Sequence, residues 1–168
     1  MNEAQKRKAL EISRKKGSDR IQINNILSAV CVGVLSVLLS LSGTRLSAWM
    51  IGQLACAIPC LVTSSLAYAK TCYRKKEEYS LWDNIGWLTH SLGYIMILNA
   101  MALMLYQANY RMITWIFLGT TIFLFLAYSV VDVVAKKRRL KEKGWKLAFY
   151  LLTVFVGSIL PIIMRWVD

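Results

Sequence analysis

The feature that most constrains this chain is a series of five apolar blocks, each of about 20 residues or more. They cover approximately residues 21–41, 48–69, 85–106, 113–135 and 147–166. A bilayer core about 30 Å thick is crossed by about 20 residues of α-helix, so each block is long enough to span a membrane. Lipid offers the backbone no hydrogen-bond partners, and the blocks lack the alternation of barrel strands. Helix is therefore the only suitable conformation.

The composition agrees with a chain that lies in a membrane. Hydrophobic residues make up 57% of the 168 residues, and the mean hydropathy is +0.45. These values exclude an ordinary soluble domain, in which apolar residues are fewer and more scattered. We therefore predict an all-α, polytopic membrane protein with five transmembrane helices.

The basic residues predict the orientation of these helices. Seven Lys and Arg precede the first block, four follow the second and seven follow the fourth, whereas the alternate connections carry only Arg45, Arg111 and Arg165. This distribution follows the positive-inside rule and predicts a cytoplasmic N-terminus and an external C-terminus in a plasma (inner) membrane. The net charge of +12 is thus a topology signal, and we predict no nucleic-acid partner.

The segments outside the blocks leave little room for a second domain. We divide the chain into a basic cytoplasmic arm, residues 1–20, and a five-helix transmembrane bundle, residues 21–168. Oppositely charged residues four apart favour a surface helix in the arm, and Gly17–Asp19 is expected to end it before the first span. The connections are too short for a soluble domain, so any function resides in the bundle, its basic face or a partner.

Polar side chains fall into two layers when their depth is counted at 1.5 Å per residue from each block end. The candidates in the cytoplasmic half are Asn25, Thr63, Ser64, His90 and Asp132, with Asp83 at the interface, and those in the outer half are Gln53 and Asn99. The matched depths predict one interhelical hydrogen-bond cluster near each surface. Such clusters hold helices in register, or they line the two vestibules of a permeation path that is closed by an apolar middle.

His90 is the only histidine of the chain. Asp83, Gly86, His90 and Gly93 are spaced by three or four residues and share one helical face, on which the glycines allow close approach of another helix. One interpretation is a neutral imidazole bonded to a neighbouring hydroxyl or carbonyl group. The other is a proton-relay or substrate-contact role, since intramembrane ionisable groups are often functional.

The expected partners of His90 come from two other blocks. Thr63 and Ser64 match its depth on the preceding, antiparallel helix. Asp132 is a candidate partner because it lies about one turn inside the fourth block, although a local pair with Lys136, four residues later, would also satisfy its carboxylate.

Small residues form stripes along two further blocks, and such stripes mark tight helix packing within the protomer or between copies. The packing candidates of the second block are Gly52 and Pro59, and those of the fifth block are Gly157 and Pro161. Pro161 cannot donate a hydrogen bond to the carbonyl group of Gly157, so we expect it to bend the outer end of the fifth helix.

The remaining motifs predict lipid contact rather than chemistry. Lys136, Lys137, Arg138 and Arg139 follow the fourth block as a stop-transfer anchor that can also bind anionic lipid headgroups. Cys56 and Cys60, with His90, are too weak a pattern for a metal site, because cysteine is a common small apolar residue. The sequence contains no Ser-His-Asp arrangement, phosphate-binding glycine loop or paired carboxylates, so we predict no catalytic residue, cofactor or metal.

These observations favour an oligomeric channel or transporter-like protein that uses the two polar layers. An alternative is a non-enzymatic accessory, immunity or effector subunit that binds a membrane protein partner. A third possibility is a membrane-embedded enzyme that acts on a lipid or isoprenoid substrate near the inner leaflet. The lipid bilayer and either a second copy or a membrane protein are the expected partners.

Overall fold

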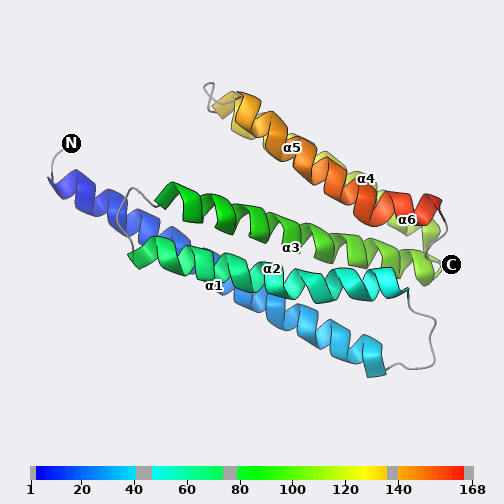
Figure 1. The fold of residues 1–168 in the computed structure, drawn as a ribbon. Coiled ribbons are helices and arrows are strands. Elements are labelled where there is room, and N and C mark those ends of the chain that lie inside the picture. Colours follow the sequence, from blue (N-terminus) through cyan, green and yellow to red (C-terminus); the bar gives the residue numbers. More distant parts are fainter. Residues whose placement is uncertain (1–2, 41–46, 74–78, 136–139, 165–168) are drawn as a thin grey trace. The chain divides into compact units, whose positions relative to one another are not determined.

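The computed structural model describes residues 3–40, 47–73, 79–135 and 140–164, and these residues are almost entirely helical (Figure 1). The elements are α1 (Glu3–Ser40), α2 (Ala48–Tyr73), α3 (Tyr79–Gln107), α4 (Arg111–Ala135), α5 (Leu140–Val154), the π-helix η1 (Phe155–Ile159) and α6 (Leu160–Ile163). The last three follow one another without a break.

Five helical stretches are long and apolar enough to cross a membrane. They are Gly17–Ser40, Ala48–Thr71, Leu81–Gln107, Arg111–Val131 and Gly144–Ile163, each near one of the five apolar blocks. The prediction of an all-α chain with five candidate membrane-spanning helices is confirmed, and the chain has the architecture of a small multi-pass membrane protein.

The helices form two compact units that share α2 and α3. Unit 1 contains α1, the part of α2 from Ala55 onward and the part of α3 up to Tyr94. Unit 2 contains the start of α2 up to Leu54, the part of α3 from Ile95 onward, and α4, α5, η1 and α6.

One face of α1 is buried in unit 1 and repeats every seven residues. Gly17, Asn24, Cys31 and Leu38 are its buried positions. Seven residues are close to two helical turns, so a heptad repeat keeps one side of a helix against its neighbours along its whole length. Three of these residues are small or polar, as expected where membrane helices approach closely.

The approach of α2 to α3 in unit 1 depends on two glycines of α3. A Cβ atom at Gly86 would lie 2.9 Å from the ring of Tyr68, and one at Gly93 would lie 3.0 Å from the side chain of Leu61. Tyr68 and Leu61 are both fully buried at these contacts. A methyl group at either glycine would therefore force the two helices or their side chains to move.

In unit 2, a tight turn joins α3 to α4. Asn109 has a φ of 66°, a left-handed conformation that asparagine adopts more readily than most residues. The backbone amide of Tyr110 donates a hydrogen bond to the carbonyl group of Leu105 at 3.0 Å, which satisfies one of the last carbonyl groups of α3. Further along, α4 faces α5 at Phe125 and Tyr150, whose rings are stacked with centroids 5.0 Å apart.

The structure corrects the expected break at Gly17–Asp19. These residues lie inside α1, which runs without interruption for 38 residues. Glycine, serine and aspartate each cost less than about 1 kcal/mol in a helix interior, which long, favourable helical segments on both sides can offset. Gly17 is buried, so its small size serves packing rather than helix termination.

Candidate functional site: two clusters of polar residues

Unit 1 holds a hydrogen-bonded group of residues from three helices, which we call the His90 cluster: Asn24, Ser64, Gly86 and His90. Nδ1 of His90 lies 2.6 Å from Oδ1 of Asn24. Nδ2 of Asn24 donates to Oγ of Ser64 at 2.9 Å, and Ser64 donates to the carbonyl oxygen of Gly86 at 2.7 Å. Asn24 and Ser64 are completely buried, whereas His90 is half-buried.

The direction of these bonds fixes the tautomer of His90. Because the amide nitrogen of Asn24 is used toward Ser64, its oxygen faces His90 as an acceptor. Nδ1 of His90 must therefore carry a proton, and in the neutral imidazole Nε2 is then the acceptor atom. Among the residues that the structure describes, none is recorded as a hydrogen-bond partner of Nε2.

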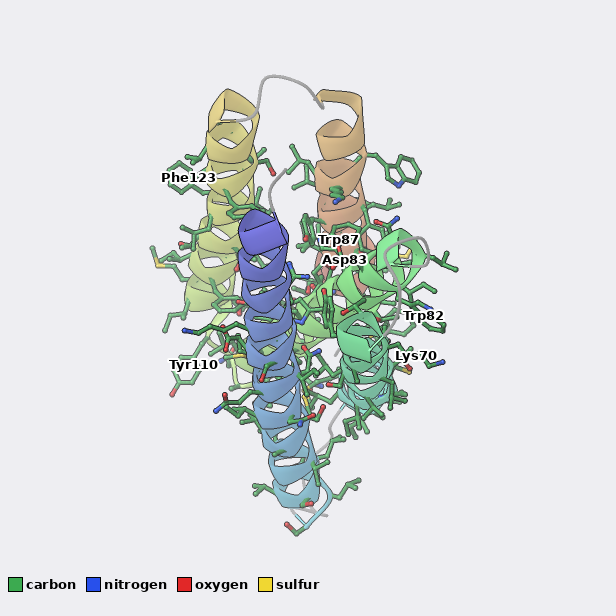
Figure 2. The ribbon with its side chains drawn as sticks, turned by 90° about the vertical axis from the view of Figure 1, so that its left-hand side faces the viewer. Lys70, Trp82, Asp83, Trp87, Tyr110 and Phe123 are labelled. Carbon is green, nitrogen blue, oxygen red and sulfur yellow. The ribbon has the colours of Figure 1, made fainter. Side chains whose placement is uncertain are left out.

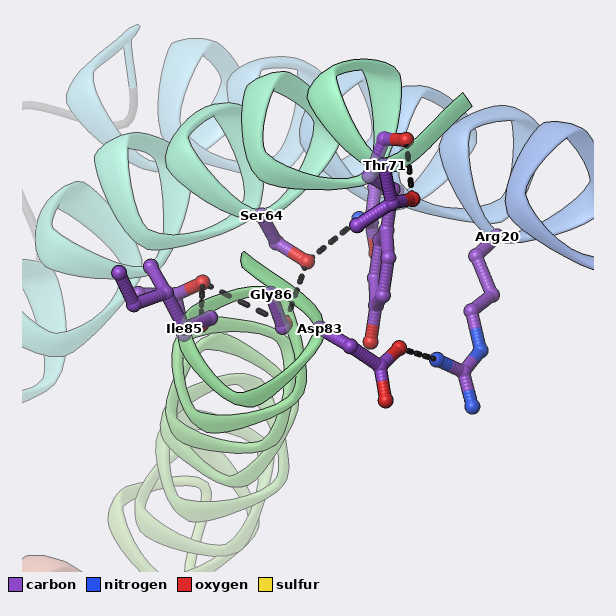
Figure 3. A network of polar contacts seen from close by, with 9 residues as sticks. Arg20, Ser64, Thr71, Asp83, Ile85 and Gly86 are labelled. Atoms are coloured by element: carbon purple, nitrogen blue, oxygen red, sulfur yellow. Dashed lines mark hydrogen bonds and ion pairs between the residues drawn. The ribbon is translucent and has the colours of Figure 1, made fainter. Parts of the chain in front are cut away.

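An ion pair between α1 and α3 lies about one helical turn from this cluster. Arg20, four residues before Asn24, donates from Nη1 to Oδ1 of Asp83 at 3.2 Å (Figure 3). Its guanidinium carbon lies 4.8 Å from the ring centroid of Tyr68. Figure 3 shows the ion pair beside the bond from Ser64 to Gly86, so charged and neutral polar groups follow one another along unit 1.

Two further aromatic contacts flank these groups. The amine of Lys70 lies 4.0 Å from the ring centroid of Trp82, and Figure 2 shows the two side chains together. Cation–aromatic pairs of this kind suit the membrane interface, where one end of the pair is apolar and the other is wet. One turn beyond His90, the ring of Tyr94 stacks with the imidazole at a centroid distance of 6.4 Å.

Unit 2 holds a second group, which we call the Asn99 cluster: Trp49, Gln53, Asn99, Gly157 and Ser158. Asn99 donates to the carbonyl oxygen of Thr153 at 3.1 Å and accepts from Oγ of Ser158 at 2.8 Å. The exposed fractions of Asn99 and Ser158 are 1% and 0%, so this cluster lies deep inside unit 2. Both polar ends of the Asn99 amide therefore have partners.

The carbonyl oxygen of Gly157 receives two donors from α2. Nε2 of Gln53 lies at 2.7 Å and Nε1 of Trp49 at 3.1 Å. Pro161 explains why this oxygen is accessible, because proline has no amide hydrogen to donate to the residue four positions earlier. The helix accommodates Pro161 through the π-turn η1, in which the amide of Leu160 donates to the carbonyl oxygen of Phe155.

The structure places the other predicted residues outside these clusters. Asn25 is exposed on α1, where its oxygen accepts a 3.3 Å bond from Ser65. Thr63 is exposed on α2, as are Gly52 and Pro59, and no described atom lies within 4 Å of a Cβ atom placed at Gly52. The helix packing predicted at Gly52 and Pro59 stays a prediction. The side chain of Asp132, and Lys136, Lys137, Arg138 and Arg139, lie outside the described residues.

Two residues of the His90 cluster region were not predicted from the sequence. Among the described side chains Asn24 is the direct partner of His90, and Arg20 is the ion-pair partner of Asp83. The available signal was the spacing of Gly17, Asn24 and Cys31, since two small residues seven positions either side of an asparagine indicate a packed face. Within the described part of the chain, no group of three or more His, Cys, Asp or Glu residues could hold a metal ion.

Comparison of the chain with protein-family models, with curated proteins and with solved structures gives no significant match.

Proposed function

We propose that the protein is a transporter-like membrane protein in which His90 is the ionisable group on a path for protons, or for a small solute that moves with them. The observation that supports this proposal is a column of polar groups within unit 1. It begins at the Arg20–Asp83 ion pair and continues through Ser64 and Asn24 to His90.

The depth of His90 favours an ionisable role. His90 lies nine residues into the span Leu81–Gln107, which corresponds to about 14 Å along the helix. A charged side chain at this depth has an unfavourable free energy in the hydrocarbon core of a membrane. Ionisable residues at such depths mark proton and substrate pathways in membrane proteins. The tautomer assigned above gives His90 one bound nitrogen and one nitrogen that can accept a proton.

Proton flux in reconstituted vesicles tests this proposal. His90→Gln keeps an amide that can donate to Asn24 but removes the titratable ring, and we expect the flux to fall at least about tenfold. Thr89→Val is the matched control, because Oγ1 of Thr89 bonds only within its own helix, to the carbonyl oxygens of Ile85 and Gly86. Wild-type flux in the His90→Gln protein, or the same loss in both variants, would contradict the proposal.

A second candidate function is that of an accessory subunit, and α2 supports it. Gly52, Cys56, Pro59 and Thr63 form an exposed stripe along this helix, and nothing lies within 4 Å of a Cβ atom placed at Gly52. A stripe of small residues that is exposed in the described part of the chain suits the helix of another membrane protein. A different protein that co-purifies with the wild-type chain, and is lost with Gly52→Leu, would support this function.

A further inference from the structure

We propose that Asn24 is a positioning residue that confines the uptake and release of a proton by His90 to Nε2, so that no proton passes through the imidazole ring from one nitrogen to the other. This inference deepens the proposed function, and it rests on that function where it concerns transport. The geometry of the His90 cluster carries it, because Asn24 and Ser64 together hold one nitrogen of the ring.

The His90 cluster begins and ends on the same helix. From His90 on α3 the contacts lead to Asn24 on α1 and then to Ser64 on α2. Ser64 donates to the carbonyl oxygen of Gly86, four residues before His90 on α3 (Figure 3). A backbone carbonyl oxygen can only accept, so the single hydrogen of the Ser64 hydroxyl is used there. Ser64 therefore accepts from the amide nitrogen of Asn24, and the oxygen of that amide is left for His90.

Asn24 cannot act as the next step of a proton relay. Its amide oxygen accepts a hydrogen bond from Nδ1–H, but an amide has no titratable proton and is a very weak base. Ser64 and the carbonyl group of Gly86, which follow it in the cluster, do not ionise either. The hydrogen on Nδ1 therefore has no exit through the cluster.

Burial keeps this arrangement in place. Asn24 and Ser64 are completely buried, so water does not compete for their hydrogen bonds. If the imidazole ring turned over, the Cδ2–H group would take the place of Nδ1–H. The buried oxygen of Asn24 would then have lost its donor, which is unfavourable. The ring is thus held with Nδ1 toward Asn24 in both of its charge states.

Nε2 is the nitrogen that remains for proton exchange. When a proton binds, an N–H bond forms at Nε2 and the ring becomes an imidazolium ion; on release the same bond breaks, and the Nδ1–H bond is unchanged throughout. The charged side chains described about one turn away, Arg20 and Asp83, pair with each other. Among the described side chains, no carboxylate contacts the ring, so an ion pair does not trap the proton on His90.

This restriction bears on the kind of transport. A relay takes a proton at one nitrogen of an imidazole ring and gives it up at the other. A ring that uses Nε2 for both steps must expose this atom first to one side of the membrane and then to the other. Within the proposed function, the His90 cluster therefore favours a carrier over a continuous proton wire.

The tautomer of His90 can be measured directly, because the chain has only one histidine and a ¹⁵N-histidine label reports on a single ring. Magic-angle-spinning NMR of the protein in phosphatidylcholine vesicles distinguishes protonated from unprotonated ring nitrogens. At alkaline pH we expect at least about a tenfold excess of the Nδ1–H tautomer. As the pH falls, Nε2 should be the nitrogen that gains a hydrogen. An excess of the Nε2–H tautomer, or an equal mixture, would overturn the proposal.

Three variants test the role of Asn24 itself. Asn24→Leu removes the acceptor and should lower the ratio of Nδ1–H to Nε2–H at least about tenfold. The matched control is Asn25→Leu, which changes the adjacent, exposed asparagine that bonds to Ser65, and it should keep the wild-type ratio. Ser64→Ala is a milder change for the case that Asn24→Leu does not fold. It should give a mixture of tautomers, because the Asn24 amide can then turn over.

A wild-type ratio in Ser64→Ala and in folded Asn24→Leu would overturn the role of Asn24. Proton flux in the same vesicles separates this result from a failure of the proposed function. Absent flux together with the Nδ1–H tautomer would contradict the proposed function and support the assignment of Asn24. Flux together with the Nε2–H tautomer would overturn that assignment alone.

Discussion

Gly157 shows how little space separates the helices of unit 2. A Cβ atom at this position would overlap the amide nitrogen of Asn99, would lie 2.8 Å from its Cγ atom, and would be 3.1 Å from Oε1 of Gln53. Both neighbours hold hydrogen bonds that depend on their positions. One hydrogen atom in place of a methyl group thus allows the whole Asn99 cluster to form.

Gly157→Ala should therefore destabilise the protein by about 1–3 kcal/mol, the usual cost of overpacking a buried site. Gly119→Ala is the matched control, because nothing lies within 4 Å of the added methyl group and alanine favours helix over glycine by up to about 1 kcal/mol. Unfolding by SDS in mixed micelles measures both changes. Equal stabilities of the two variants would show that the contact around Gly157 relaxes without cost.

At the same scale, the sequence could not distinguish Asn24 from Asn25. The two residues are adjacent, yet one is completely buried against His90 and Ser64 and the other is exposed. In a soluble helix the apolar stripe would identify the inward face. Apolar residues surround a membrane helix on all sides, so hydrophobic periodicity does not show how the helix is rotated. The positions of small residues are the remaining guide.

At the scale of the element, the break in α-helical geometry near the end of the chain is linked to α2. Pro161 leaves the carbonyl oxygen of Gly157 without its usual donor, and Gln53 and Trp49 donate to that oxygen from another helix. The expected bend at Pro161 therefore takes the form of a π-turn over Phe155–Ile159 with interhelical hydrogen bonds beside it. A single proline accounts for both features.

Pro161→Ala should weaken the link between these helices, because the substituted alanine supplies a backbone amide that competes for the oxygen of Gly157. We expect Gln53→Leu to be destabilising in the wild-type background and less so in the Pro161→Ala background, with a coupling energy of about 0.5–1 kcal/mol. A double-mutant cycle of SDS unfolding measures this value. Additive effects would indicate that Gln53 and Pro161 act independently.

At the scale of the whole molecule, the number of helices could be predicted from block length alone. The thickness of a membrane is nearly fixed, and one helix of about 20 apolar residues crosses it. All five candidate spans lie at the apolar blocks. The partition into two units that share α2 and α3 was not predictable in this way. It depends on which helix faces contact one another, and block length carries no information about those contacts.

The predicted orientation can be tested on the intact protein. The excess of basic residues in alternate connections predicts that Cys72 lies on the cytoplasmic side and the turn at Ala108 on the outside. A membrane-impermeant maleimide applied to intact cells should label Ala108→Cys in a background without native cysteines, and should leave Cys72 unlabelled when it is the only cysteine. Labelling of Cys72 from outside would reverse the topology.

The length of α1 has a mechanical consequence. The helix continues without a break from the span Gly17–Ser40 to Glu3, so residues 3–16 extend it by about 21 Å. The helix is continuous between residues 3–16 and the candidate span Gly17–Ser40, so any tilt of the span also tilts the N-terminal turns. A tilt of about 10° would displace their tip sideways by about 4 Å. A tilt of α1 within the lipid would thus move the basic residues near its N-terminus, because the helix has no hinge between them and the span.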